Sequence, residues 1–474
     1  MDVPQTQQNS TIYLALHQRF RPDWHPVCSA FSVMRVLVSG DAGPVVSGTI
    51  AELLRRGHSV RLRSPNAADE ARRWNRVEPF DAIGGSAGGC DAIIHIGPGD
   101  ADAMLAEAER ESGFRRFAYV IASHAADPLS LDDSRIGWTV IRHSPVYGPG
   151  DELVSPVLKI VRSLPVVPVV ERGEQRVRPI WYEDLARAVV ALVERRDTAR
   201  RTFAIAGSEW ITVNELVDRL RKITARKPLR VPVPRALERI AASFPDDTLA
   251  SPMRLREFGV NETTLDRGLR ILADALPEQF LDEGVGRVHH KRFHAGIRGS
   301  RHSTASLMAI FRDRVNEIIP IEFVAEPGAA ARIERGAAMT MSLPGRGHVQ
   351  VRVERCDPTD IVFATLEGHP IAGMVEFTTR DLPGGVIRFA VDNYSRGGNL
   401  LDTLALRTAG EPAQSANWRK VVENMIEASG GTSDGVSVES HVLDDDAAAL
   451  VERRLRELVE KRQRDESASP ERPA

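Results

Sequence analysis

The sequence contains few cysteines and no pair of them in a CxxC spacing. Three occur in 474 residues, Cys28, Cys90 and Cys356. This scarcity argues against a disulfide-stapled secreted domain and against a zinc ribbon, and it is typical of proteins kept in a reducing compartment. We therefore predict a cytoplasmic protein in which each cysteine is simply a small apolar side chain.

Long apolar runs and an excess of one charge are also absent. The formal net charge is -3, so nothing in the overall charge favours nucleic acid as a partner. No stretch is long and apolar enough to span a bilayer, so we expect no membrane segment. Hydrophobic residues make up 42% of the 474 positions, which is ample for two domains with separate cores.

Residues 1–33 show no sustained hydrophobic period and lack the basic-then-apolar layout of a signal peptide. Met34 stands directly before the first strand pattern. We interpret residues 1–33 as a disordered or mis-annotated extension and assign no function to it.

The clearest pattern in the chain runs from Met34 to Pro65. A short apolar run, Arg35–Ser39, predicts a buried parallel strand that leads into Gly40 and Gly43. Apolar residues at helical spacing follow, and a second strand begins at Ser59. A strand, a glycine turn and a helix amino terminus together favour an anion, because unpaired N–H groups and the helix dipole point at it.

Further strand and helix patterns alternate after this unit. Apolar runs at Cys90–Ile96 and Arg116–Ser123 flank a helical pattern at Ala101–Glu111. Repeated βα units of this kind predict an α/β fold with a Rossmann-like, doubly wound parallel sheet.

These residues resemble the short-chain dehydrogenase/reductase superfamily, in the extended or atypical branch of NAD(P)-dependent epimerase/dehydratase-like proteins. Gly40 and Gly43 match the family loop GxxGxxG, whereas Val46 occupies its third position and predicts a shifted helix. The segments RHSPVYGPGD and RPIWYEDLARAVVALVE match later family motifs, so the likeness covers about residues 34–234. It implies a dinucleotide site that includes Gly40, Gly43, Arg63, Gly97 and Tyr147.

The end of the second strand indicates which cofactor the resemblance favours. An acidic residue there would bind the ribose hydroxyls of NAD, but this chain has Arg61 and Arg63 and no carboxylate until Asp69. We predict NADP(H) in preference to NAD(H). The alternative is that these arginines are ordinary solvated residues at a strand end.

The catalytic pair that the resemblance implies is missing. Family enzymes use a tyrosine followed four residues later by a lysine, and none of the five tyrosines here has that lysine. Only thirteen residues separate Ser123 from Gly137, too few for the usual catalytic helix. Ser123 and His124 remain as weak candidates for catalysis, because a histidine there could act as an acid or base.

Residues 286–303 are basic and free of acids, and we predict a linker between a dinucleotide-binding domain at 34–285 and a second domain. His290 and His294 have the spacing of a metal pair on a helix, and His302 follows. Because no carboxylate or cysteine accompanies them, we expect no metal site.

Residues 304–431 change to a helix, a run of strands and a final helix. This α+β order resembles the helix-grip fold of START-like, polyketide-cyclase-like proteins, which implies a cavity for a hydrophobic small molecule. We expect four apolar residues to line it, Val351, Phe363, Met374 and Phe389. Residues 432–474 predict a polar linker, an amphipathic helix that docks on either domain or on a second copy, and a disordered tail.

Two classes of function remain open from the sequence. The first is a non-catalytic NADP(H)-binding or cofactor-sensing protein with a lipophilic-ligand domain. The second is an NADP-dependent oxidoreductase, or a nucleotide-sugar epimerase/dehydratase-like enzyme, with a rearranged active site. The absent tyrosine–lysine pair favours the first, because proton transfer by such a group is worth about 10²–10⁴-fold in rate.

Overall fold

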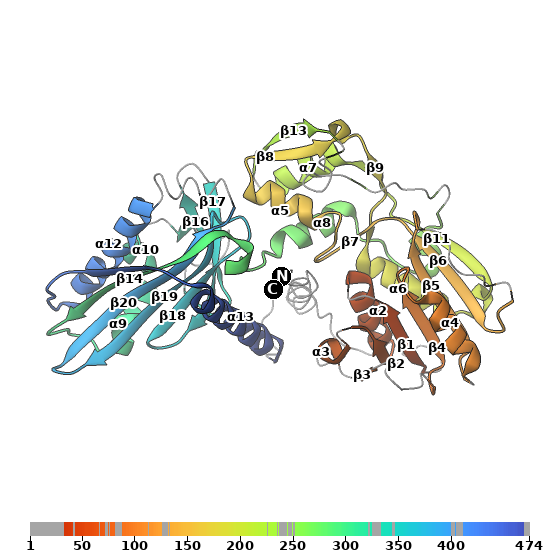
Figure 1. Cartoon of the computed structure of the whole chain (residues 1–474), viewed down its shortest axis with the longest axis horizontal. Helices are drawn as coiled ribbons and strands as arrows, with labels where there is room; N and C mark the ends of the chain where they lie inside the picture. The colour runs from red at the N-terminus through yellow and green to blue at the C-terminus, as the bar shows by residue number, and fades with distance from the viewer. Residues whose placement is uncertain are drawn as a thin grey trace. The chain divides into compact units, whose positions relative to one another are not determined.

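The computed structural model divides the chain into two compact units, Met1–Ala275 and Leu276–Ala474 (Figure 1). We call them unit 1 and unit 2 and describe each by itself. The structure describes residues 33–468 except positions 41–42, 66, 72–73, 75, 81–87, 112, 126–130, 132, 225, 235, 237–243, 245–248, 250–251, 321–322, 325–332, 344–346, 400–402 and 404–410. The predicted amino-terminal extension and the last residues of the predicted tail lie outside this description.

Unit 1 is built on a seven-stranded parallel sheet in the order β3-β2-β1-β4-β5-β6-β11. The strands are β1 (Arg35–Gly40), β2 (Ser59–Arg63), β3 (Val77–Pro79), β4 (Ala92–Ile96), β5 (Arg116–Ala122), β6 (Gly137–His143) and β11 (Arg201–Ile205). Strand order reverses between β1 and β4, and ligands of such sheets bind at this switch point, beyond the carboxyl ends of the strands. The predicted Rossmann-like doubly wound sheet is confirmed.

Helices cover both faces of this sheet (Figure 1). Helices α2 (Pro44–Arg55) and α6 (Tyr182–Glu194) pack on one face, where Val36 and Val38 point. Helix α4 (Ala101–Arg110) packs on the other face, against Leu37 and Ile93. The strands are apolar on both sides because each alternate residue faces a helix layer. A short helix, α3 (Ala67–Ala71), precedes β3.

The rest of unit 1 is a smaller layer with its own apolar cluster. It contains the strand pairs β7 (Val146–Tyr147) with β10 (Ile180–Trp181), β9 (Arg176–Val177) with β12 (Ile211–Thr212), and β8 (Val166–Val170) with β13 (Leu229–Val233). Its helices are α5 (Ser155–Ser163), α7 (Val213–Ile223) and α8 (Leu265–Asp274), with the 3₁₀ turn η1 (Glu171–Gly173). Two further 3₁₀ turns, η2 (Arg196–Thr198) and η4 (Leu255–Phe258), pack with α6 beside the main sheet.

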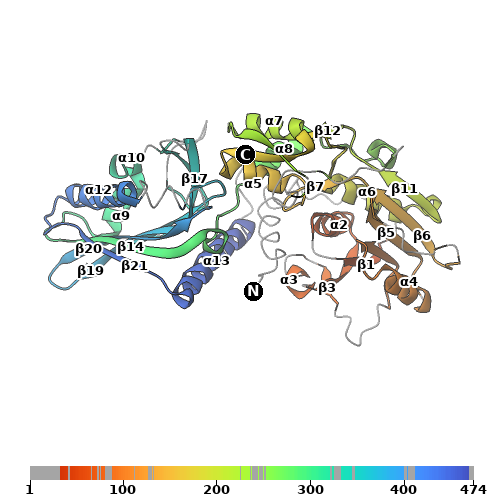
Figure 2. The same ribbon diagram turned by 45° about the horizontal axis from the view of Figure 1, so that its top comes forward.

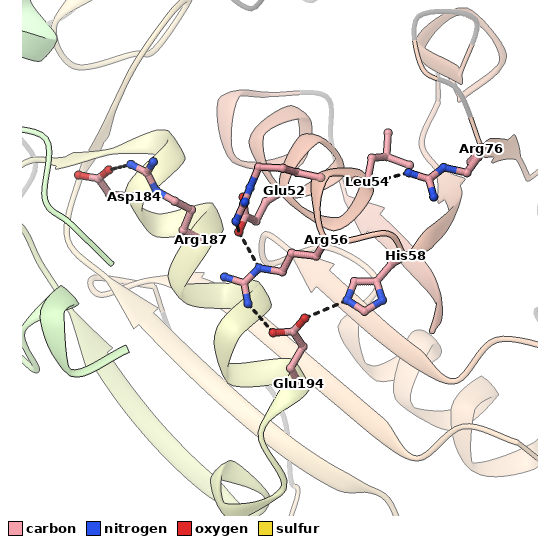
Figure 3. Close-up of polar contacts among 9 residues, drawn as sticks. Glu52, Leu54, Arg56, His58, Arg76, Asp184, Arg187 and Glu194 are labelled. Carbon is pink, nitrogen blue, oxygen red and sulfur yellow. Dashed lines mark hydrogen bonds and ion pairs between the residues drawn. The ribbon is translucent and has the colours of Figure 1, made fainter. Parts of the chain in front are cut away.

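A buried polar cluster joins the carboxyl end of α6 to the end of α2 (Figure 3). The Glu194 carboxylate accepts from Arg56 and, at 3.0 Å, from Nε2 of His58. Because the backbone N–H of Met34 donates to His58 Nδ1 at 3.1 Å, the ring hydrogen belongs on Nε2. Met34 and His58 precede β1 and β2, so this cluster lies at the amino-terminal ends of the strands, away from the expected cofactor edge.

Unit 2 is an antiparallel sheet in the order β15-β16-β17-β18-β19-β20-β14-β21. Its strands are β14 (Val285–Ile297), β15 (Phe323–Val324), β16 (Ala338–Leu343), β17 (Gly347–Cys356), β18 (Asp360–Thr365), β19 (Ile371–Leu382), β20 (Val386–Gly397) and β21 (Ser437–Val442). A 3₁₀ turn, η5 (Leu281–Glu283), precedes β14.

The helices of unit 2 lie on opposite faces of its sheet (Figure 2). Helices α9 (Thr304–Asp313), α10 (Val315–Ile318) and α12 (Glu411–Ser429) share one apolar cluster with the sheet. The ring of Phe377 lies 4.5 Å from that of Phe311 and 5.8 Å from that of Trp418 within this cluster. Helix α13 (Asp445–Ala468) packs on the other face through Leu455 and Leu458. Among the residues described, no helix is both long and apolar enough to cross a membrane.

The predicted basic linker at 286–303 is wrong for most of its length. Residues Val285–Ile297 form β14, which lies between β20 and β21. Its alternate residues Phe293, Ala295 and Ile297 are buried in the cluster under α12. The same alternation continues toward the amino end at Lys291 and His289. Because these two side chains are polar, the sequence does not show the alternation of apolar residues that is typical of a strand.

Three further expectations for the carboxy-terminal half need correction. His290 and His294 lie on a strand, where they pair with Asp392 at 2.8 Å and Glu439 at 3.0 Å, and not on a helix. The predicted polar linker contains β21. The amphipathic helix that follows it, α13, docks on the sheet of its own unit, which is one of the alternatives expected. Met374 belongs to the α13 face, because a strand alternates its sides and Val375 faces α12.

Candidate functional site

Gly40 and Gly43 lie on either side of positions 41–42, which the structure does not describe. Gly40 ends β1 with a φ of +146°, and a Cβ there would lie 2.3 Å from the carbonyl oxygen of Ile96 on β4. Only glycine fits this position without moving the sheet. Gly43 is the N-cap of α2, and the first turn of the helix holds no acidic residue. The positive end of α2 therefore faces the carboxyl edge of the sheet.

Val46 occupies the third glycine position of the resembled loop, and a glycine, Gly48, follows two residues later. Val46 is buried in the core under the sheet. Two residues later, a Cβ on Gly48 would lie 3.2 Å from Cβ of Ala186 and 3.2 Å from Cδ2 of Tyr182. Gly48 thus permits close packing of α2 on α6, and not of helix on strand. The family motif does not identify this residue, whose neighbours lie far away in the sequence.

The end of β2 carries an ion pair that the sequence did not indicate. Arg63 donates through both terminal nitrogens to Glu107 of α4, at 2.6 and 2.9 Å. Its guanidinium also lies 4.5 Å from the ring centre of Phe80. Arg61 is paired with Glu78 at 2.9 Å. Both arginines therefore have carboxylate partners in this chain, so a cofactor 2′-phosphate at Arg63 would lie beside the Glu107 carboxylate.

Gly97 and Tyr147 occupy different surroundings. Gly97 follows β4 with a φ of +105°, and a Cβ there would meet no atom within 4 Å. It is therefore an open position on the edge that also holds Gly40. Tyr147 is 1% exposed in the smaller layer, where its ring packs edge-on against Trp181 at 5.2 Å. Its hydroxyl lies against Gly268 of α8, and a place beside the nicotinamide stays a prediction.

The two catalytic candidates follow β5. Ser123 is buried, and its backbone N–H donates to the carbonyl of His143 at 2.8 Å, whereas His124 is exposed. The structure therefore places Ser123, His124 and His143 on the same carboxyl edge as Gly40 and Gly97. His143 is a residue that sequence reasoning noted only as a departure from the family proline.

The imidazole of His143 is neutral at pH 7. Burial, with a smaller contribution from nearby His124, lowers the pKa of His143 to about 4. Its Nδ1 lies 2.8 Å from the carbonyl oxygen of Ser144. Since a carbonyl only accepts, Nδ1 carries the hydrogen and Nε2 is left as an acceptor. A group of this kind is a poor proton donor at neutral pH.

In the described residues of the connection from β5 to β6, which exclude 126–130 and 132, there is no helix of the kind on which the resembled enzymes carry their tyrosine and lysine. Between Ser123 and Ile136 the described residues form turns and bends only. The sequence has no tyrosine followed four residues later by a lysine. No described tyrosine therefore has, at that spacing, the neighbouring ammonium that would lower its pKa in the resembled enzymes. The described residues of this edge thus show no recognisable pair for hydride-coupled proton transfer.

No protein-family model matches the chain. It is 27% identical over 96 residues to NADH dehydrogenase [ubiquinone] 1 alpha subcomplex subunit 9, mitochondrial, from Dictyostelium discoideum. The match covers 20% of this chain and 27% of that protein. The chain therefore matches about a quarter of the length of that relative.

Similar solved structures include UDP-glucose 4-epimerase from Thermotoga maritima with UDP-glucose, at 18% identity and a TM-score of 0.39 over 51% of this chain and 98% of that one. Another is the Bordetella bronchiseptica enzyme WbmF with NAD+ and UDP, at 18% identity and a TM-score of 0.38 over 52% of this chain and 92% of that one. A third is UDP-glucuronic acid 4-epimerase from Bacillus cereus with UDP-glucuronic acid and NAD, at 15% identity and a TM-score of 0.38 over 51% of this chain and 98% of that one.

Proposed function

We propose that unit 1 binds a nicotinamide dinucleotide, NADP(H) in preference to NAD(H), and senses or holds the cofactor without catalysing hydride transfer. One contrast carries the proposal. Gly40 at the end of β1 and Gly43 at the N-cap of α2 support a pyrophosphate at the positive end of this helix, whereas the described part of the β5–β6 connection has no helix for a tyrosine and lysine.

The matched relative supports a binding role. Its name describes a subunit of a larger assembly, NADH dehydrogenase. A dinucleotide fold that serves an assembly or a sensing step needs the glycine turn but not an acid–base pair. The sequence departs from the enzyme pattern in this way, because the first two loop glycines, Gly40 and Gly43, are kept and the catalytic pair is missing.

Thermal melting of the full chain with NADPH or NADH tests the binding claim. Ligand at about 1,000 times its Kd should stabilise the folded state by about 4 kcal/mol, so NADPH should raise the melting temperature at lower concentration than NADH. Arg63→Gln should reduce this difference, and Arg110→Gln, an exposed arginine on α4, should leave it unchanged. If neither nucleotide shifts melting at millimolar concentration, the turn is only a structural connection.

The competing proposal is an enzyme with a rearranged active site, an NADP-dependent oxidoreductase or an epimerase/dehydratase-like enzyme. It is favoured by the position of Ser123 and His124 on the carboxyl edge of the sheet. NADPH oxidation that depends on an added carbonyl compound or nucleotide sugar, and that His124→Ala abolishes, would establish it. We expect no such oxidation.

For unit 2 we propose a helix-grip fold like that of START-like proteins. Among the described residues, the order of one strand, two helices, six strands and a long helix supports it, as does the packing of α12 across one sheet face. Val351, Phe363 and Phe389 face α12 as expected, but they belong to a packed cluster with other side chains. A lipophilic ligand in this domain stays a prediction.

A further inference from the structure

The unit 2 sheet ends in an open strand. Strand β21 is the last strand in the sheet order, and among the described elements it pairs only with β14. All of its residues are exposed, including Val438 at 41% and Val442 at 50%. An edge strand of this kind presents backbone N–H and C=O groups to another strand, so it is either protected from other chains or used to bind one.

The ladder with β14 decides which backbone groups of β21 point outward. The N–H of Leu443, the residue after β21, donates to the carbonyl oxygen of Val288 at 2.9 Å. In an antiparallel pair the bonded residues alternate, so every second residue back from Leu443 also bonds to β14. The other residues of β21 direct their N–H and C=O groups away from β14, and these are Val438, Ser440 and Val442.

These outward residues are self-complementary. A second copy related by a two-fold axis at Ser440 would place Ser440 opposite its own copy and Val438 opposite Val442. In this register each outward N–H meets a carbonyl oxygen of the second copy. Val438 lies on the α12 face, because it is opposite Phe293, which is buried under α12. The pairing would therefore cover the exposed valines of both copies on that face.

The charged residues of β21 select this register from its neighbours. On the opposite face, the axis at Ser440 places Glu439 opposite His441 of the second copy. An axis at Glu439 would place two carboxylates opposite each other, and an axis at His441 would place two imidazoles opposite each other. The Glu439 carboxylate pairs with His294 of its own chain at 3.0 Å and has further lone pairs with which to accept from a second copy. The register centred on Ser440 is thus the one that pairs unlike groups.

We propose that unit 2 pairs with a second copy of this chain through β21, with the two-fold axis at Ser440, so that the two sheets form one antiparallel sheet. A second copy fits this edge because the strand itself supplies the matching valine and the opposite polar partner at each position. One short strand from each copy is a small interface, so we expect a reversible dimer that dissociates in the micromolar range. The proposal does not depend on cofactor binding by unit 1.

Sedimentation velocity of the full chain, from low to high micromolar concentration, tests the pairing. We expect a monomer–dimer equilibrium. Ser440→Pro should weaken it about thirtyfold, because it removes the central outward N–H of each copy and leaves the bonds to β14 in place. Ser440→Thr is the matched control, because it keeps this N–H, and it should change the dissociation constant by less than about threefold.

A charge exchange tests the register. Glu439→Lys and His441→Glu should each weaken self-association about tenfold, because the first removes the unlike pair and the second places carboxylates opposite each other. An equimolar mixture of the two variants should associate within about threefold of the parent chain. In that mixed dimer the introduced lysine lies opposite the introduced glutamate, and the other pair is the parent one.

Disulfide cross-linking locates the axis. In the proposed pair the two copies of position 440 have Cα atoms about 5.5 Å apart, within reach of a disulfide, whereas those of position 438 lie about 14 Å apart. Mild oxidation should therefore cross-link Ser440→Cys above the level of the parent chain and leave Val438→Cys at that level.

The other outcomes contradict the proposal. A chain that stays monomeric throughout would mean that the charges on β21 protect the edge. A dimer that Ser440→Pro and both charge variants leave intact would place the interface elsewhere, and a cross-link at position 438 but not at 440 would rule out the register. Should Ser440→Pro melt below the parent chain, the two charge variants and their mixture decide, and a mixture no tighter than either variant overturns the proposal.

Discussion

Arg462 should be the residue on which docking of α13 depends most. Its guanidinium is 4% exposed and contacts three carboxylates, Glu354 at 2.7 Å, Glu278 at 2.9 Å and Glu466 at 2.9 Å. Glu278 and Glu354 are themselves buried. Arg462→Met removes the charge while keeping much of the apolar stem. Removing one partner of a buried ion pair costs about 3–5 kcal/mol, because it leaves charge in a low-dielectric interior.

The free-energy cost of Arg462→Met should depend on pH, because the neighbouring Glu354 gains or loses its charge with pH. Burial, with repulsion from Glu278, raises the pKa of Glu354 to about 7. A raised pKa means that the folded state binds the proton more tightly, so this group favours folding at pH 4 and the contribution is lost as the pH rises through 7. Without Arg462 the pKa of Glu354 rises further. The penalty of Arg462→Met should therefore be largest above pH 7 and smaller at pH 5.5, where Glu354 is neutral.

Hydrogen exchange followed by mass spectrometry on the full chain measures this locally. At pH 8, after correction for intrinsic exchange rates, amides of α13 should exchange on the order of 10²–10³ times faster in Arg462→Met than in the parent chain. This ratio corresponds to the cost of about 3–5 kcal/mol, because about 1.4 kcal/mol changes an equilibrium constant tenfold. Asp465→Asn on the same helix should leave exchange unchanged, because its ion pair with Arg335 is exposed. An increase below threefold, or an equal increase at both pH values, would refute the reasoning.

Three further predictions concern unit 1. Glu107→Gln should strengthen NADPH binding relative to NADH about tenfold by calorimetry, because it removes the anion beside Arg63; an unchanged ratio would show that the 2′-phosphate lies elsewhere. Gly48→Leu should lower the free energy of unfolding by about 1–3 kcal/mol through overpacking between α2 and α6, whereas Gly99→Ala, which would meet no atom, should not. Glu194→Gln should cost about 2 kcal/mol in chemical denaturation, since it weakens two charge-assisted bonds; a cost near zero would contradict the buried cluster.

The amino-acid sequence predicted the parallel sheet well because its signals are local. The apolar run before Gly40, the helix start at Pro44 and the left-handed Gly57 after α2 all act within a few residues. The capping box of α7 is of the same kind, since Thr212 and Glu215 exchange hydrogen bonds three residues apart. The position of Gly40, Gly97, Ser123 and His124 at one edge follows from parallel strands alone.

Tertiary structure decided what depends on partners distant in the chain. The partner of Arg63 is Glu107, 44 positions later, and no local pattern announces it. The segment expected to be a basic linker is the strand β14, which lies between β20 and β21. Its basic residues acquire their neighbours only when these two strands pair with it, so the sequence alone did not indicate a strand. The sequence by itself determined which stretches are strands, turns and helix ends in unit 1. Only the folded chain decided which charges meet, because Coulomb and packing energies depend on distance in space and not along the chain.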